Sequence, residues 1–179
     1  MASQSIVIKT IDEIHKYEQL IKENSDKTLA NIKELLTIEN SIDVFYEFKF
    51  CRLGYEPIQG YELNFIEQLN QMFSHMVVLK GAEILIKRYP DKEFILNLGT
   101  QGGYDIVSSD DKIICECFST TNPISNNKIK LDAEKLMKNN TAESKYIIFY
   151  SKEVNPITLN NIIDKYKDIT FLKLDRLTV

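Results

Sequence analysis

The N-terminal half of the chain has apolar residues at helical spacing. Between residues 10 and 36, apolar positions recur every three or four residues from Ile11 to Leu36, and the polar stretch 23–28 interrupts them. This pattern predicts two helices or one kinked helix. Residues 41–53 fit either an alternating strand or a weaker helical face, so the pattern leaves their secondary structure open.

A longer helical pattern runs from residue 61 to residue 88. It follows a segment broken by glycine and proline, residues 54–60, and Pro90 stops it. Gly81, inside the pattern, is a candidate position for a bend. We therefore expect one long helix here, before the pattern of the chain changes.

Beyond residue 90, short apolar runs alternate with helical patterns. Three consecutive strands joined by short turns favour an antiparallel meander, and the later strand–helix–strand units favour neighbouring parallel strands. We expect an α/β fold, in which a mixed β-sheet is flanked by helices on both faces. The predicted strands cover residues 93–98, 104–108, 112–119, 145–151 and 169–174, and the predicted helices cover residues 126–139 and 157–167.

The length of 179 residues is enough for one domain with a sizeable core. We divide it into a helical N-terminal region, residues 1–60, packed on an α/β core, residues 61–179. Hydrophobic residues make up 44% of the chain and charged residues 27%, which is typical of a globular protein. The chain has neither an apolar run of about 18 residues nor a signal-peptide pattern, so we expect a soluble, cytoplasmic protein that makes no membrane contact.

Net charge and cysteine content limit the types of ligand and metal site that we expect. The net charge of −4 weakens hypotheses that need many contacts with nucleic-acid phosphates. Cys51, Cys115, Cys117, His15 and His75 are too few and too scattered to form a structural zinc site. A metal, if one binds, is expected to have oxygen ligands.

A glutamate lies within the most apolar predicted strand. Side chains alternate along residues 112–119, so Glu116 shares a face with Ile114 and Phe118. A carboxylate among large apolar groups is costly unless it is paired, protonated or bound to a cation. The alternative is an edge-strand glutamate that faces solvent.

An aspartate on the preceding strand is the natural partner of Glu116. Asp105 comes opposite or diagonal to Glu116 if the two strands form a hairpin. Two carboxylates at that range either share a proton or bind a hard divalent cation such as Mg²⁺. The alternative for Asp105 alone is an ordinary turn or strand-edge aspartate after Gly102 and Gly103.

These residues resemble the active site of the PD-(D/E)xK nuclease superfamily. That site has an aspartate on one strand and, on the next, an acidic residue, any residue and a lysine; Tyr104–Asp105 and Glu116–Cys117–Phe118 stand at these positions. Tyr104 replaces a proline that many members lack, and Phe118 replaces the lysine. The order of elements across residues 76–151 is also similar, which implies a restriction-endonuclease-like sheet with a helical N-terminal extension.

The resemblance implies further site residues. In this superfamily the lysine can move to the following helix, where Lys128 is the first candidate and Lys130 the second. Both also fit a solvated helix face, because Lys128 and Asp132 form an i,i+4 pair. A third acid often comes from the helix before the strands, and Glu83 is the candidate metal ligand there, although it also fits an exposed helix glutamate.

The implied activity is that of an endonuclease that hydrolyses DNA with Mg²⁺ or Mn²⁺ held by Asp105 and Glu116. No DNA-reading motif is visible in the sequence. The chain also resembles, less specifically, the small catalytic subunits of heterodimeric restriction endonucleases. Its partners would then be DNA and either a larger DNA-recognition subunit or a second copy, with residues 10–88 as candidate docking surfaces.

Two other interpretations stay open. Phe118 in the lysine position favours a catalytically inactive nuclease-fold protein that binds a partner or nucleic acid. A helical interaction protein is favoured if Asp105 and Glu116 lie more than about 10 Å apart, beyond the reach of one metal ion. A dinucleotide-binding fold fits poorly, because residues 99–105 lack the glycine fingerprint and a following helix.

Overall fold

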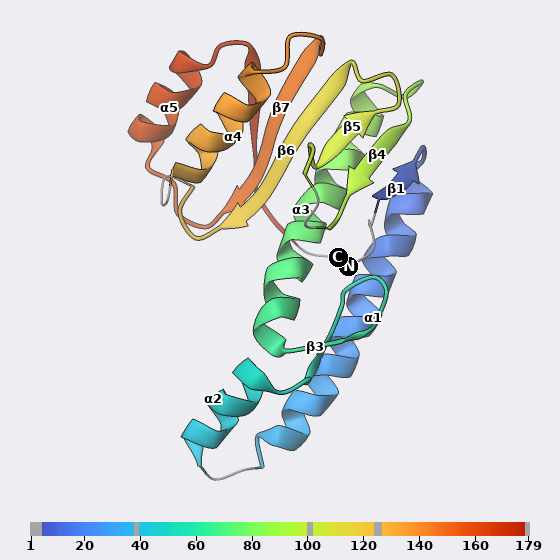
Figure 1. Ribbon diagram of the computed structural model, residues 1–179, viewed down its shortest axis with the longest axis vertical. Coiled ribbons are helices and arrows are strands. Elements are labelled where there is room, and N and C mark those ends of the chain that lie inside the picture. Colours follow the sequence, from blue (N-terminus) through green and yellow to red (C-terminus); the bar gives the residue numbers. More distant parts are fainter. Residues whose placement is uncertain (1–4, 38–39, 100–101, 124–126, 178–179) are drawn as a thin grey trace.

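The computed structural model describes residues 5–37, 40–99, 102–123 and 127–177 (Figure 1). The described helices are α1 (Ile11–Leu35), α2 (Ser41–Phe50), α3 (Phe65–Arg88), α4 (Lys128–Met137) and α5 (Pro156–Lys165). The described strands are β1 (Ser5–Ile8), β2 (Gly54–Tyr55), β3 (Glu62–Leu63), β4 (Phe94–Asn97), β5 (Ile106–Ser108), β6 (Ile113–Thr120), β7 (Ser144–Ser151) and β8 (Ile169–Leu174). None of these helices combines the length and apolar character needed to cross a lipid bilayer.

Six strands form one mixed sheet. Their order is β1-β4-β5-β6-β7-β8, and β2 pairs with β3 in a separate two-stranded ladder. The β4–β5–β6 meander is antiparallel, whereas β6, β7 and β8 run parallel. The expected meander and the expected parallel neighbours are therefore confirmed. The sequence analysis did not predict β1, which adds an antiparallel edge strand beside β4.

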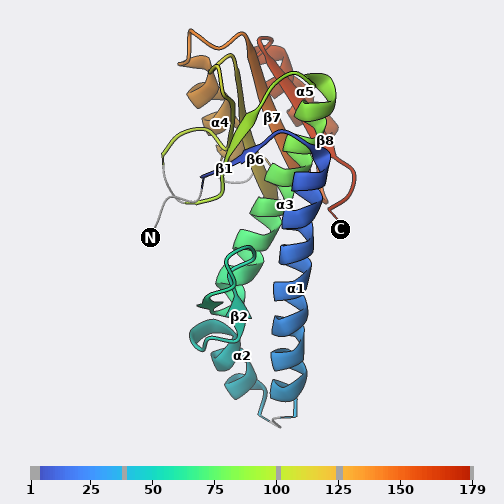
Figure 2. The ribbon, with the colours of Figure 1, turned by 90° about the vertical axis from the view of Figure 1, so that its right-hand side faces the viewer.

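Helices cover both faces of the sheet, as expected (Figures 1 and 2). Cys115 and Cys117 of β6 pack in one core cluster with Leu85 and other residues of α3. Ile114 and Phe118, which point the opposite way, pack in a second cluster with residues of α4. The alternation along β6 thus divides its side chains between two buried layers.

The long helices α1 and α3 lie side by side and extend beyond the sheet, with α2 at the far end (Figures 1 and 2). Where the sequence predicted an interruption or a kink, α1 runs without a break from Ile11 to Leu35. The polar stretch of α1 stays helical because its side chains form tertiary hydrogen bonds: Asn24 Nδ2 donates to Pro57 O at 3.0 Å. Residues 41–50 form α2; the sequence pattern left the secondary structure of this segment open.

Gly81 allows α3 to approach the sheet closely. A Cβ at this position would lie 3.1 Å from Ile106 Cδ1 and 3.2 Å from Cys117 Sγ. The helix continues through Gly81 to Arg88. The glycine therefore has a packing role, in place of the bend that the sequence suggested.

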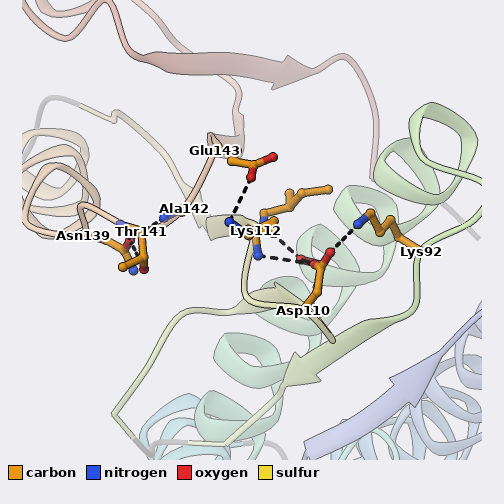
Figure 3. Close-up of polar contacts among 9 residues, drawn as sticks. Lys92, Asp110, Lys112, Asn139, Thr141, Ala142 and Glu143 are labelled. Atoms are coloured by element: carbon orange, nitrogen blue, oxygen red, sulfur yellow. Dashed lines mark hydrogen bonds and ion pairs between the residues drawn. The ribbon is translucent and has the colours of Figure 1, made fainter.

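The turn between β5 and β6 is held by polar contacts (Figure 3). Asp110 Oδ1 accepts a hydrogen bond from Ser108 Oγ at 2.7 Å, and the carboxylate also pairs with Lys92. Lys112 Nζ, after the turn, lies 2.9 Å from Glu143 Oε1. These contacts hold the turn, and burial on both faces of β6 specifies the hairpin register, because a slip by one residue would turn every side chain to the other face. That register determines where the two acids of the candidate site meet.

Candidate functional site

The candidate site lies where β6 extends past β5. The antiparallel ladder between them ends at the pair Ile106–Cys115, so β6 continues from Glu116 onward without a β5 residue beside it. Asp105, directly before β5, accepts a hydrogen bond from the Cys117 N–H through Oδ2 at 2.7 Å. The Asp105 carboxylate therefore satisfies a backbone donor of β6 that the short neighbouring strand leaves open.

Asp105 and Glu116 belong to the same face of the sheet. Val107 lies opposite Ile114, and two residues further along each strand the alternation places Asp105 opposite Glu116 on that face. Glu116 is 3% exposed. Burial and then the Asp105 charge raise the pKa of Glu116 to about 7, and burial also raises the pKa of Asp105. The two carboxylates that the sequence placed on neighbouring strands are thus electrostatically coupled.

Lys135 of α4 supplies the cation that pairs with Glu116. Its Nζ lies 2.6 Å from Glu116 Oε1 and donates a hydrogen bond to Gly103 O. The same ammonium group is 5.3 Å from the centroid of the Tyr104 ring. Sequence reasoning missed Lys135. The signal that could have found it is the seven-residue spacing from Lys128, which places both side chains on one helix face.

Lys128 and Asp132 form a second ion pair on that helix face. Lys128 Nζ lies 2.6 Å from Asp132 Oδ1 and 5.6 Å from the centroid of the Phe118 ring. Asp132 is 4% exposed, and burial raises the pKa of its carboxyl group. Its charge also raises the pKa of both Asp105 and Glu116. Asp132 is therefore a third acid of this neighbourhood, whereas the sequence alone indicates only a surface partner of Lys128.

Two other candidates from the sequence lie elsewhere. Glu83 of α3 pairs with Lys87 at 2.6 Å and with Lys80 at 3.4 Å, and the Lys87 hydrogen bond lowers the pKa of Glu83. Lys130 is 3.8 Å from Glu134 on the outer part of α4. Neither residue lines the cavity beside Asp105 and Glu116. The structure therefore does not bring Glu83 or Lys130 to the candidate site.

Phe118 belongs to the core. Its ring stacks on Phe149 of β7, with centroids 5.4 Å apart and an interplanar angle of 12°. The side chain is 5% exposed and packs in the layer under α4. The strand position that holds lysine in the resembling superfamily thus contributes to the hydrophobic core, and the cations of the site come from α4.

The acids line a cavity of about 580 Å³. Its walls come from α3, the β4–β5 connection, β6 and α4. The described lining residues are Tyr61, Asn70, Gln71, Ser74, His75, Val78, Asn97, Leu98, Gly99, Gly102, Gly103, Asp105, Glu116, Cys117, Phe118, Ser119, Lys128 and Lys135. A cavity of this volume is within the range of about 300 to 1,000 Å³ that is usual for small-molecule sites.

His75 is a buried histidine in the cavity wall. Its Nε2 lies 2.8 Å from Leu98 O, and because a carbonyl oxygen only accepts, Nε2 carries the hydrogen. Nδ1 faces Glu56 Oε1 at 3.8 Å. Burial lowers the pKa of His75, which favours the neutral imidazole. His75 therefore ties α3 to the connection that carries Gly99, Gly102 and Gly103 into the cavity.

The carboxylate oxygens of the site fit a hard divalent cation that has few protein ligands. Within the described ranges, no group of three or more His, Cys, Asp or Glu side chains is arranged to hold a metal ion. Mg²⁺, however, commonly uses one or two carboxylates, with waters and substrate phosphates as its other ligands. Glu116 Oε1 is buried and lacks a well-aligned hydrogen bond, although Lys135 Nζ lies 2.6 Å away. Above about pH 7, where Glu116 is ionised, the three carboxylates outnumber the two lysines and leave net negative charge for a cation.

Comparisons with known proteins identified no relative of this chain. No protein-family model, no curated protein and no solved structure matches this chain.

Proposed function

We propose that this chain is a Mg²⁺- or Mn²⁺-dependent endonuclease with a restriction-endonuclease-like fold, and that it hydrolyses phosphodiester bonds in DNA. One arrangement supports the proposal: Asp105 and Glu116 share a face at the end of the β5–β6 hairpin, and Lys135 Nζ lies 2.6 Å from Glu116. A pair of carboxylates with an adjacent cation is the set of groups that metal-assisted phosphodiester hydrolysis requires.

Each residue has a distinct role in the proposed reaction. Asp105 and Glu116 would hold the metal, which when bound would polarise the scissile phosphate and lower the pKa of a water molecule. Lys135 stabilises the negative charge that develops on the phosphate, in place of a lysine at position 118. Lys128, anchored by Asp132, adds a second positive charge at the cavity wall.

The helical arm, formed by α1, α2 and the part of α3 that extends beyond the sheet, provides the proposed contact with a larger DNA-recognition subunit or a second copy. Four large apolar side chains of α2 are exposed: Ile42 (74%), Phe45 (67%), Tyr46 (57%) and Phe50 (66%). An exposed apolar group of this size on one short helix is typical of an interaction site. Figure 2 shows α2 at the end of the long helices that is distant from α4 and β6.

A plasmid-nicking assay with Mg²⁺ tests the proposed activity. Asp105→Asn and Glu116→Gln should each lower the nicking rate by roughly 100-fold or more. Glu83→Gln is the matched control, since it removes a carboxylate that does not line the cavity, and should leave the rate unchanged. Equal rates for wild type, Asp105→Asn and Glu116→Gln would refute the proposal.

A non-catalytic DNA- or partner-binding subunit is the second candidate function. The observation that favours it is the burial of Phe118 against Phe149, which removes the usual lysine position. In that case the purified chain binds DNA or its partner but shows no Mg²⁺-dependent nicking. Asp105→Asn would then leave the binding affinity unchanged.

A further inference from the structure

The cavity has two chemically different walls. Asp105, Glu116, Lys128 and Lys135 form an ionic wall on the side of the sheet and α4. The opposite wall is one face of α3, since its lining positions 70, 71, 74, 75 and 78 recur at helical spacing. This face is uncharged, because the burial of His75 favours its neutral form, and its residues other than Val78 are polar.

Two amide side chains on the α3 face are available to a ligand. Asn70 is exposed and Gln71 is half-buried, and both line the cavity. Across the part of the chain that the structure describes, neither side-chain amide has a hydrogen-bond partner. Amide side chains carry both donors and acceptors, and they pair with the edges of nucleobases, adenine above all.

An aromatic ring also lines the cavity. Tyr61, which precedes β3, is 46% exposed. Exposed aromatic rings in nucleic-acid-binding grooves stack on unpaired bases with little dependence on sequence. The α3 side therefore combines groups that read a base edge with a ring that can stack on its face.

We infer that the α3 side of the cavity is a base-binding subsite, formed by Tyr61, Asn70 and Gln71, that receives one unpaired nucleotide of a DNA strand. This inference rests on the proposed nuclease function, because it assigns the ionic wall to the phosphate. A nucleotide has one ionic end and one neutral, hydrogen-bonding end, which matches the division of the cavity walls.

The depth of the acids excludes a fully stacked duplex as the preferred substrate. Glu116 is 3% exposed, so a scissile phosphate reaches it only by entering the cavity of about 580 Å³. A cavity of that volume accommodates a ligand of drug size, such as one nucleotide. A nucleotide of a single strand or a mismatched site enters such a cavity at a lower cost of unstacking and unpairing than a nucleotide of a matched duplex. Single-stranded DNA and mismatched sites are therefore the favoured substrates.

Binding of fluorescein-labelled DNA to the full chain in EDTA tests the subsite without cleavage. The probes are a 20-nucleotide single strand, the same sequence as a blunt duplex, and that duplex with one mismatch. We expect the single strand and the mismatched duplex to bind at least tenfold more tightly than the blunt duplex. Equal affinities for all three probes, or tighter binding of the blunt duplex, would overturn the inference.

Variants separate base reading from stacking. Asn70→Ala combined with Gln71→Ala should weaken single-strand binding by roughly tenfold and reduce the difference in affinity between oligo-dA and oligo-dT. Tyr61→Leu should weaken both homopolymers alike. Asn161→Ala on α5 is the matched amide control and should change neither. If the double variant binds as wild type does, the subsite is wrong.

Cleavage measured in parallel distinguishes this inference from the proposed function. Mg²⁺-dependent cutting of blunt duplex without single-strand preference would refute the subsite and retain the nuclease. Single-strand preference in binding that depends on Asn70 and Gln71, with no cutting of any probe, would retain the subsite and refute the nuclease.

Discussion

Lys135 Nζ lies 2.6 Å from Glu116 Oε1, and this ion pair joins α4 to the second acid of the candidate site. The lysine side chain is 43% exposed, whereas the glutamate side chain is 4% exposed. The cation thus stays in contact with solvent at the cavity mouth while its partner carboxylate is buried. Such a lysine can move toward a phosphate without leaving a buried charge of its own.

Replacing Lys135 should affect catalysis far more than replacing Lys130. Lys135→Met keeps the length of the side chain but removes the charge beside Glu116, so we expect the nicking rate to fall roughly 100-fold. Lys130→Met removes an exposed lysine that pairs with Glu134 outside the cavity, and its rate should match wild type. Equal losses in the two variants would contradict the assignment of Lys135.

Glu116→Gln should stabilise the fold at high pH. The pKa of Glu116 is raised from 4.5 to about 7, so the folded state binds the proton more tightly and its stability falls as pH rises through this window. At pH 8 without metal, the variant should exceed wild type by up to about 3 kcal/mol in the free energy of unfolding. Urea denaturation at pH 4.5 and pH 8 measures this difference. An advantage that is as large at pH 4.5 as at pH 8 would contradict the buried, proton-binding carboxylate.

Divalent metal should stabilise the protein more at pH 8 than at pH 6. Metal and proton compete for Glu116, and raising the pH through about 7 removes the proton. We expect the thermal shift produced by Mg²⁺ or Mn²⁺ to grow over this interval in wild type. Glu116→Gln should abolish most of the shift, and Glu83→Gln should preserve it. A shift of the same size at both pH values, or one retained in Glu116→Gln, would argue against this metal site.

The two acids could be predicted from the sequence, but their cation could not. Strand alternation and a tight hairpin are local rules, and they suffice to place Asp105 and Glu116 on one face. Which lysine of α4 reaches that face depends on how the helix packs across the sheet. Lys128 and Lys135 are both on the inner side, and their spacing alone does not say which one contacts Glu116.

Dependence on tertiary contacts also explains where the structure differs from the fold that the sequence predicts. Residues 93–174 follow the predicted order of strands and helices, because long apolar runs and clear breaks are local signals. The edge strand β1 has four residues, too few for a distinct pattern. The polar stretch in α1 suggested a break, but Thr28 is buried and donates to Gln68 Oε1 at 2.5 Å. Tertiary hydrogen bonds therefore keep this stretch helical.

Residues 124–126, in which we expected the start of the helix before Lys128, lie outside the described ranges, and Asn127 is the N-cap of α4.

Gly81→Val should destabilise the protein through overpacking. The first added carbon would already lie 3.1 to 3.3 Å from Ile106, Cys117 and Ile148, and valine adds two more methyl groups. We expect a loss of about 1 to 3 kcal/mol in the free energy of unfolding, measured by urea denaturation. Ala30→Val, on the exposed side of α1, is the matched control and should cost about 0.5 kcal/mol. A stable Gly81→Val variant would contradict the close approach of α3 to the sheet.

Phe118→Lys tests whether a lysine on β6, two residues after Glu116, can supply the cation of the proposed site. The substitution places a charge in the layer where Phe118 stacks on Phe149. We expect a loss of about 3 to 5 kcal/mol in the free energy of unfolding and no gain in nicking rate. Phe118→Leu, which keeps the apolar contact, should cost less and retain activity. If Phe118→Lys folded normally and cut faster than wild type, the strand position would hold the catalytic cation after all, and the assignment of that role to Lys135 would be wrong.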